Sequence, residues 1–223
     1  MNLALFDLDG TLLPIDSDHA FGEFMIEVGW ADAAKFRSRN DLFYAQYQRG
    51  ELDVPAYVEF STAPWRGKPA SDALAMRERF VRERIAPVLH ESARALVRGH
   101  QARGDLVAIV TATNEFVTRP IADALGVDDL IALQLERDAA GRVTGAIHGV
   151  PTYREGKVAR VVQWLHGRGL SLAAFDRVAA YGDSSNDIPL LERATDPVAT
   201  NPGPALEAVA RERGWRILRL FDQ

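Results

Sequence analysis

The chain has 223 residues, 47% of them hydrophobic and 26% charged, so it can bury one sizeable core but would crowd two large domains. Its lack of cysteine excludes disulfides and thiolate chemistry, and its net charge of −5 argues against a nucleic-acid partner. No apolar run suggests a membrane span or a signal peptide, so we expect a cytoplasmic protein with no membrane partner.

A short strand is predicted at residues 3–6, where the sequence reads Leu-Ala-Leu-Phe. Two carboxylates follow it directly, Asp7 and Asp9, and Gly10 allows the backbone to turn away. In open α/β sheets this carboxyl end of the strands is where ligands bind. Two acids this close repel each other unless a cation is present, and Mg²⁺ prefers carboxylate oxygens. The stretch therefore indicates a magnesium site, and a capped strand end is the competing explanation.

No run typical of a buried strand occurs between residues 14 and 87. Apolar residues recur there at helical spacing in four stretches, which predicts a small helical bundle inserted after the first strand. The aromatic residues of this segment, including Trp30 and Trp65, are most simply interpreted as its hydrophobic core. We therefore expect an inserted domain at 14–87 and a core built from 1–13 and 88–223.

From Glu91 onward, predicted helices and strands alternate, which favours an α/β fold with a Rossmann-like, mostly parallel sheet flanked by helices. The expected strands are 106–111, 130–135, 178–181, 197–200 and 215–220, with part of a hairpin at 141–148. The expected helices are 91–103, one that ends at 125, 155–167, 188–193 and 204–214.

Two polar residues lie at the ends of these elements. Thr111 closes the strand 106–111, and its hydroxyl and the amides that follow are suited to an anion, although helix capping explains a threonine equally well. Lys157 lies at the start of a helix, where a cation is unfavourable unless an anion is nearby. A solvated lysine is the simpler explanation for Lys157 alone.

The stretch from Val178 to Asp187 carries the strongest signal. A buried strand ends at Gly182, and Asp183 and Asp187 flank small polar residues at the turn into a helix. Acids four residues apart at a helix start can face one cation directly or through water. A polar turn capped by Asp187 is the competing explanation.

Taken in chain order, four segments resemble the four motifs of the haloacid dehalogenase (HAD) superfamily: Asp7-Leu-Asp9-Gly-Thr11, Thr111, Lys157 and Gly182-Asp183-Ser-Ser-Asn-Asp187. The helical insertion between the first two motifs is similar to a C1-type cap. The overall layout resembles the phosphoserine phosphatase-like branch, subfamily IB.

The resemblance implies a phosphatase in which Asp7 attacks phosphorus, forming an aspartyl-phosphate, and Asp9 acts as general acid and base. Dehalogenase-like members lack this second acid and the metal, so Asp9 favours a phosphohydrolase over a C–halogen hydrolase. A phosphonatase would need a cap lysine for a Schiff base. The only lysines of the insertion, Lys35 and Lys68, do not lie in a convincing context for one.

The resemblance also implies a metal site. Asp7, the backbone carbonyl of Asp9 and Asp183 would hold Mg²⁺, and Asp187 would contact these ligands rather than the ion itself. The other two motif residues, Thr111 and Lys157, would neutralise and position the transferring phosphoryl oxygens.

A small phosphomonoester is the expected substrate, because a cap closing over the cleft leaves little room for a macromolecule. Asp16 resembles by position the acid that phosphoserine phosphatases use for the substrate ammonium, and Asp18 lies close to it. A substrate carboxylate would call for an arginine, for which Arg66 is the candidate. The complete set of predicted substrate-binding residues is Asp16, Asp18, Arg66, Thr113, Asn114 and Asn186.

Several alternatives stay open at this point. Phosphoserine and histidinol phosphate are comparable substrates, and broad activity on small phosphate esters is a third option. Histidinol phosphate, an amino-alcohol phosphate, would need the acids but not the arginine. A non-catalytic or regulatory binding protein on the same fold is the opposing hypothesis, since a fold alone does not establish a function. The sequence does not indicate an oligomeric state.

Overall fold

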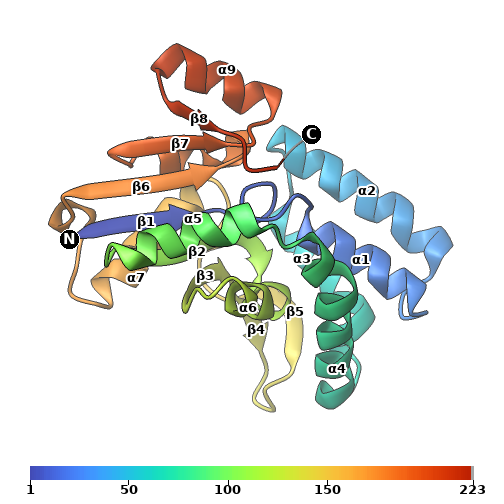
Figure 1. The fold of residues 1–223 in the computed structure, drawn as a ribbon. Helices are drawn as coiled ribbons and strands as arrows, with labels where there is room; N and C mark the ends of the chain where they lie inside the picture. Colours follow the sequence, from blue (N-terminus) through green and yellow to red (C-terminus); the bar gives the residue numbers. More distant parts are fainter. Residues whose placement is uncertain (222–223) are drawn as a thin grey trace.

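A six-stranded parallel sheet forms the centre of the computed structural model, which describes residues 1–221 (Figure 1). The strand order is β3-β2-β1-β6-β7-β8, so β1 lies between β2 and β6. The carboxyl ends of these three strands therefore meet where the order of the sheet reverses, the usual place for a ligand in an open α/β sheet. The strands are β1 (Asn2–Phe6), β2 (Leu106–Asn114), β3 (Asp129–Leu133), β6 (Arg177–Gly182), β7 (Asp196–Thr200) and β8 (Arg216–Leu218).

Helices cover both faces of the sheet, because successive side chains of β1 point to opposite faces and both sets are apolar. Ala4 and Phe6 pack in the hydrophobic cluster that includes α5 and α6. Leu3 and Leu5 pack in the cluster that includes α7, α8 and α9. The bounds are α5 (Glu91–Ala102), α6 (Glu115–Ala124), α7 (Glu155–His166), α8 (Ile188–Leu191) and α9 (Pro204–Arg213). The predicted α/β class is confirmed.

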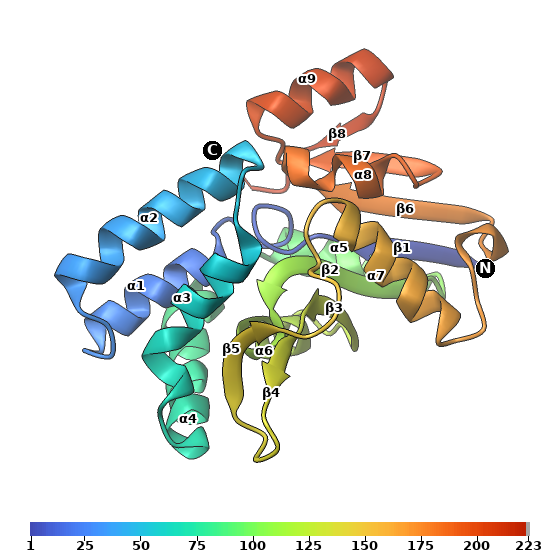
Figure 2. The same ribbon diagram turned by 180° about the vertical axis from the view of Figure 1, so that it is seen from behind.

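Four helices lie between β1 and α5 in the chain: α1 (Ser17–Glu27), α2 (Ala33–Arg49), α3 (Val54–Arg66) and α4 (Ala70–Phe80). Asp16, Asp32 and Asp53 cap the first three, each accepting a hydrogen bond from a backbone amide. A π-helical turn (Val81–Ile85) and a 3-10 turn (Ala86–Val88) return the chain to the sheet. Figure 2 shows these helices grouped beside the carboxyl end of β1.

The insertion shares its hydrophobic core with the sheet rather than forming an independent bundle. Phe21 and Trp65 both contact the ring of Phe116 in α6, and the Trp65 and Phe116 rings stack with centroids 4.1 Å apart. Both also belong to the cluster that contains Phe6. The insertion is therefore attached to the sheet domain by continuous apolar packing.

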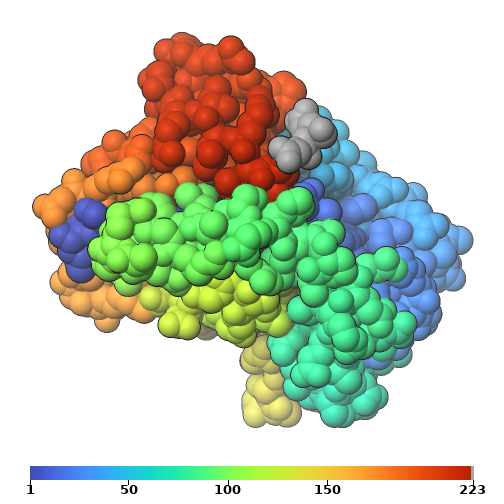
Figure 3. Space-filling model, in the orientation of Figure 1, coloured from blue at the N-terminus to red at the C-terminus, as the bar shows by residue number. Residues whose placement is uncertain are grey.

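A short antiparallel hairpin of β4 (Leu135–Arg137) and β5 (Val143–Ile147) projects from the end of the main sheet (Figure 2). The sequence predicted one strand over 130–135, but β3 ends at Leu133 and β4 belongs to the separate hairpin. The tip of the hairpin lies next to α4 on the face shown in Figure 3. Two smaller helical turns, Leu172–Ala174 and Ser185–Asp187, complete the described elements. Within residues 1–221, every helix is too short or too polar to cross a membrane.

Candidate active site

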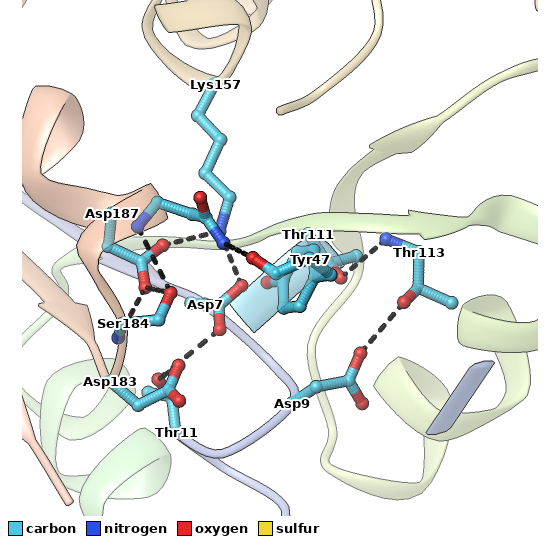
Figure 4. A network of polar contacts seen from close by, with 11 residues as sticks. Asp7, Asp9, Thr11, Tyr47, Thr111, Thr113, Lys157, Asp183, Ser184 and Asp187 are labelled. Carbon is cyan, nitrogen blue, oxygen red and sulfur yellow. Dashed lines mark hydrogen bonds and ion pairs between the residues drawn. The ribbon is translucent and has the colours of Figure 1, made fainter. Parts of the chain in front are cut away.

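Asp7 directly follows β1, and only 1% of its surface is exposed (Figure 4). Its amide donates a 2.9 Å hydrogen bond to the carbonyl of Tyr181 in β6, which continues the strand pairing up to this residue. Lys157, in the first turn of α7, places Nζ 2.6 Å from Asp7 Oδ1 and 2.5 Å from Asp187 Oδ1. Two carboxylates therefore compensate a lysine that would otherwise be unfavourable at a helix start.

Three acids converge at this edge of the sheet. Asp7, Asp183 and Asp187 offer carboxylate oxygens that all lie within 4.8 Å of one another. Thr11 Oγ1 lies 3.4 Å from Asp7 Oδ2 and 3.5 Å from Asp183 Oδ1, so it bridges the ends of β1 and β6. Gly10 has a φ of 76°, and a Cβ there would come within 2.2 Å of Asp183 Oδ2. Only glycine therefore allows Asp183 to approach this loop so closely.

This donor set fits a hard divalent cation, because it consists of carboxylate oxygens at the spacing of one shared ion. Asp187 is the acid of the three whose two carboxylate oxygens both accept short hydrogen bonds from protein donors. Its Oδ1 accepts from Lys157, and its Oδ2 accepts from the amide and hydroxyl of Ser184, both at 3.2 Å. Asp7 and Asp183 are therefore the better-placed direct ligands, with Asp187 holding Lys157 in position.

The electrostatics of the cluster favour an additional positive charge. Burial, together with repulsion from Asp187 and Asp9, raises the pKa of Asp7 to about 7 against the attraction of Lys157. Partial burial, with Asp7 and Asp187 nearby, raises the pKa of Asp183 well above its usual range. Burial opposes the charged form of Lys157, but Asp187 and Asp7 outweigh it and raise the pKa of that lysine. One lysine does not balance three acids, and a divalent cation would complete the balance.

Asp9 points away from this cluster in Figure 4 and is held separately. Its Oδ1 accepts a 2.8 Å hydrogen bond from the Ser17 amide, and its Oδ2 accepts one of 2.9 Å from Thr113 Oγ1. Burial, followed by repulsion from Asp16, raises the pKa of Asp9 to about 7. A carboxyl group with a pKa near neutrality is suited to both giving and taking a proton at that pH.

The remaining polar residues predicted from the core motifs make hydrogen bonds to neighbouring loops and helices. Thr111 Oγ1 accepts from the Thr113 amide at 3.1 Å. Asn114 caps α6 through Val117 N and also donates to Asp18 Oδ1 at 3.3 Å. Asn186 donates a 3.0 Å hydrogen bond to the carbonyl of Tyr47 in α2. Asn114 and Asn186 thus join the core to the insertion at the two sides of the site.

A cleft between the sheet edge and the insertion leads to these acids. A space of about 400 Å³ is lined by Asp9, Asp183 and Asp16, with Tyr44 and Tyr47 from α2. An adjoining space shares Asp16, Tyr44 and Tyr47 and extends to other side chains, among them Asp18, His19, Tyr57 and Tyr153. Among the residues that line either space in the described chain, there is no arginine or lysine.

The acids of the insertion, Asp16 and Asp18, line the same cleft. Asp16 accepts from the His19 amide at 2.8 Å and so begins α1. Asp18 accepts from Asn114 and shares the lining with Tyr57 of α3. Burial and the neighbouring charge of Asp16 raise the pKa of Asp18 to about 8. This part of the cleft can therefore become more negative as the pH rises, which suits a cationic ligand group.

The sequence does not distinguish the tyrosines of the cleft from core aromatic residues. The prediction that the aromatic residues of the insertion form its core holds for Phe21, Phe24 and Phe80, which are buried. Tyr44, Tyr47 and Tyr57 instead line the cleft. The sequence feature that could separate these tyrosines from core phenylalanines is the phenolic hydroxyl, because a tyrosine usually places this polar group where water or a ligand can reach it.

Arg66 differs from its expected placement, because the structure does not bring it to this cleft. It lies nine residues after Tyr57 in α3, roughly 13 Å along the helix axis at the standard rise. Its guanidinium donates to the carbonyl of Thr144 in β5 at 3.2 Å and lines a different cavity. The expected arginine for a substrate carboxylate is therefore not supplied by this residue.

Comparisons with known proteins agree with this fold and show the family of the chain. The chain is 41% identical over 217 residues to the histidinol-phosphatase of Neisseria meningitidis serogroup C (strain 8013), covering 97% of this chain and 98% of that protein. It is 30% identical over 217 residues to the phosphoserine phosphatase SerB1 of Mycobacterium tuberculosis (strain ATCC 25618 / H37Rv), covering 96% of this chain and 69% of that protein.

Two solved structures are informative. A crystal structure of a protein of unknown function from Bordetella pertussis Tohama I shares 49% identity, with a TM-score of 0.93 and 99% of each chain covered. A substrate-bound phosphoserine phosphatase complex shares the fold at 19% identity, with a TM-score of 0.68 and 97% and 91% of the two chains covered. The family model for haloacid dehalogenase-like hydrolases matches residues 4–192. The chain therefore belongs to the haloacid dehalogenase-like hydrolase family.

Proposed function

We propose that this hydrolase is a Mg²⁺-dependent phosphomonoesterase that acts on a small cationic phosphate ester of the histidinol phosphate class. The observation that carries the reaction is the buried contact of Lys157 with Asp7 beside Asp183, with Asp9 held separately at the same cleft. The observation that carries the substrate class is a cleft lined by acids and tyrosines without arginine or lysine.

Asp7 is the proposed nucleophile. Lys157 holds Oδ1, which leaves Oδ2 for the phosphorus atom. A bond forms between Asp7 and phosphorus while the bond from phosphorus to the ester oxygen breaks, giving an aspartyl-phosphate and an alcohol. Lys157 neutralises part of the charge that the phosphoryl group brings into a water-poor site, and Thr111 contributes a hydroxyl at its edge.

Asp9 is the proposed acid and base. Its proton goes to the departing alkoxide in the first step. In the second step Asp9 removes a proton from the water that attacks phosphorus, which releases inorganic phosphate and restores the Asp7 carboxylate. The hydrogen bonds from Ser17 and Thr113 fix its orientation for both transfers.

Asp7, the backbone carbonyl of Asp9 and Asp183 would hold Mg²⁺, and Asp187 would keep Lys157 oriented beside it. The cation would supply charge neutralisation for the phosphoryl oxygens and for the clustered carboxylates. The insertion, residues 14–87, is proposed to act as a cap that excludes water from the cleft.

Histidinol phosphate fits this cleft better than phosphoserine does. Its ammonium group has Asp16 and Asp18 as partners, and an imidazolium would lie among Tyr44, Tyr47 and Tyr57. Phosphoserine adds a carboxylate, which would meet acids and neither arginine nor lysine among the described lining residues. The relative named histidinol-phosphatase supports the same choice.

The test is magnesium-dependent phosphate release from histidinol phosphate and phosphoserine, measured with the wild type and Asp7→Asn. We expect histidinol phosphate to have the higher kcat/KM and Asp7→Asn to reduce both activities to background. A preference for phosphoserine would refute the substrate assignment alone. Equal rates for wild type and Asp7→Asn would refute the nucleophile and would revive the alternative of a non-catalytic binding protein.

A further inference from the structure

A second cavity, of about 490 Å³, lies apart from the catalytic acids, since none of Asp7, Asp9 and Asp183 lines it. It is lined by the end of α3, by α4, by the start of α6 and by the tip of the β4–β5 hairpin, and it is open to solvent on one side. Figure 3 shows α4 and the hairpin tip side by side on this part of the surface. The cavity therefore spans the boundary between the insertion and the core.

The charge of this cavity is opposite to that of the whole chain. The chain carries a net charge of −5, yet one acid, Glu115, lines the cavity. The cationic residues that line it are Arg66, Lys68, Arg77, Arg119, Arg137 and Arg142. Glu115 is already engaged, because its carboxylate accepts from the Leu135 amide at 2.9 Å and 3.2 Å and lies 3.8 Å from Arg137. The cavity therefore presents a positive field to a ligand.

Contacts outside the cavity hold several of these cations in place. Arg66 donates to the Thr144 carbonyl, Arg119 to Asp123, and Arg142 to Asp138. Side chains that are already held by such contacts lose less conformational entropy when an anion binds. The positive side chains are thus partly organised before any ligand arrives.

Two aromatic rings of the lining are largely covered by their neighbours. Trp65 and Phe116 are 4% and 8% exposed, and their rings are nearly parallel at an interplanar angle of 11°. The Arg77 guanidinium lies over the Phe116 ring, 5.1 Å from its centroid. The lining also includes apolar residues such as Leu74 and Val143, which favour an organic anion over a fully hydrated inorganic ion.

The cations of this cavity differ in whether an acid already pairs with them. Arg119, Arg137 and Arg142 form ion pairs with Asp123, Glu115 and Asp138. Arg66 and Arg77 have no ion pair among residues 1–221, so their charge is available to an anion in the cavity. Lys68, which has no ion pair among the described residues and contacts the Trp30 ring, adds a further charge at the rim.

We propose that this cavity is a second binding site, for a small organic anion whose oxygens are held by the unpaired cations Arg66, Lys68 and Arg77 while its apolar body lies against the apolar part of the lining. Because α3, α4 and α6 all contribute to the cavity, the bound anion joins the insertion to the core. The site is independent of the phosphatase chemistry, and its test does not depend on the assignment of the substrate.

The test follows the indole N–H groups of the ¹⁵N-labelled protein by NMR during titration with 2-naphthoate. The chain has four tryptophans, and Trp65→Phe identifies the Trp65 signal by its loss while keeping an aromatic ring in the wall. We expect a saturable shift of the Trp65 signal. The neutral analogue 2-naphthylmethanol should give no saturable shift over the same concentrations, because it cannot use the positive field.

Arg77→Met should weaken 2-naphthoate binding by roughly ten- to a hundredfold, the usual range for losing a hydrogen bond to a charged group. Arg77→Lys, which keeps the charge but loses the guanidinium group, should fall between Arg77→Met and the wild type. Arg82→Met is the matched control, since Arg82 is exposed and lies outside the cavity. The spectra themselves report whether each variant is folded.

Three outcomes would overturn the proposal. They are the absence of a saturable shift, equal affinity in Arg77→Met and the wild type, and equal binding of the neutral analogue. In addition, a shift that disappears when inorganic phosphate occupies the catalytic cleft would assign the 2-naphthoate to that cleft and would also overturn it.

Discussion

Two groups of carboxylates lie in or next to one cleft, and they are held in different ways. The sheet-edge group, Asp7, Asp183 and Asp187, is fixed by the ends of adjacent strands and by the buried Lys157. The insertion group, Asp16 and Asp18, belongs to the start of α1 and lies among tyrosines, with neither arginine nor lysine in the described lining. The first group is therefore partly balanced within the core by Lys157, whereas a cationic ligand would favour the ionised form of the second.

This difference suggests separate roles for the two groups in the proposed reaction. The sheet-edge group has oxygens at the spacing of one shared ion, which suits chemistry that is the same for every phosphate ester. The insertion group lies on the segment whose helices pack over the cleft, which suits recognition of the part of the substrate that varies. Changes in the first group should therefore affect all substrates, and changes in the second only cationic ones.

The largest effect on kcat among these variants is expected at Asp9, next to the sheet-edge group. Asp9→Asn should lower kcat for histidinol phosphate by roughly 10²–10⁴-fold, the usual contribution of a general acid and base. The amide can still hydrogen-bond to Ser17 and Thr113, so the geometry should be retained. With p-nitrophenyl phosphate, whose leaving group needs no proton, Asp9→Asn should release a stoichiometric burst of nitrophenolate before slow turnover. Unchanged kcat for histidinol phosphate would remove Asp9 from the mechanism.

A smaller and selective effect is expected in the insertion group. Asp18→Asn should raise KM for histidinol phosphate by about tenfold, the size of one charge-assisted interaction, and leave p-nitrophenyl phosphate turnover unchanged. Glu59→Gln is the matched control, because it makes the same chemical change at an exposed position of α3. If Asp18→Asn harmed both substrates equally, the proposed division between the two groups would be wrong.

The pH dependence of stability tests the charge balance of the cleft. The pKa values of Asp7 and Asp9 are raised to about 7 and that of Asp18 to about 8, from an ordinary value of 3.8. Between about pH 4 and 8 the folded chain therefore holds protons that the unfolded chain has lost, so stability falls as the pH rises. A cation that binds the ionised carboxylates should reverse this loss.

We therefore expect Tm in EDTA to decrease from pH 5 to pH 8, by about 2–4 °C for each kcal/mol lost in a chain of this size. The gain in Tm on adding Mg²⁺ should be larger at pH 8 than at pH 5. Asp7→Asn should show a weaker pH dependence and a smaller gain with Mg²⁺. A gain from Mg²⁺ that is independent of pH would contradict the proposed cause.

The two groups also differ in how far the sequence could predict them. Asp7 and Asp183 each follow a recognisable apolar strand, and parallel strands bring their carboxyl ends to one edge, so their convergence could be expected from pattern alone. The cleft of the insertion depends on how α1, α2 and α3 pack. Helical periodicity did not distinguish Tyr57, which lines the cleft, from core aromatic residues, and it did not place Arg66.

The smallest effect on kcat is expected at Asn201, which holds the loop that follows β1 and carries Thr11. Asn201 donates to the carbonyls of Gly10 and Thr11 at 2.8 Å and 3.2 Å, and its Oδ1 accepts from the Leu220 amide. Its φ of 45° makes glycine the substitution that adds no backbone strain. Asn201→Gly should cost about 1–2 kcal/mol of stability and lower kcat a few-fold, because the loop that carries Thr11 loses its anchor.

Asn2 provides the control at the other end of β1, where its amide donates to Asp105 at 3.0 Å. Asn2→Ala should lower Tm but leave kcat unchanged, since that hydrogen bond lies a full strand length from Asp7. Comparing the two variants separates a loss of stability from a loss of positioning. If both lowered kcat in proportion to Tm, Asn201 would support the fold in general rather than the loop beside the nucleophile.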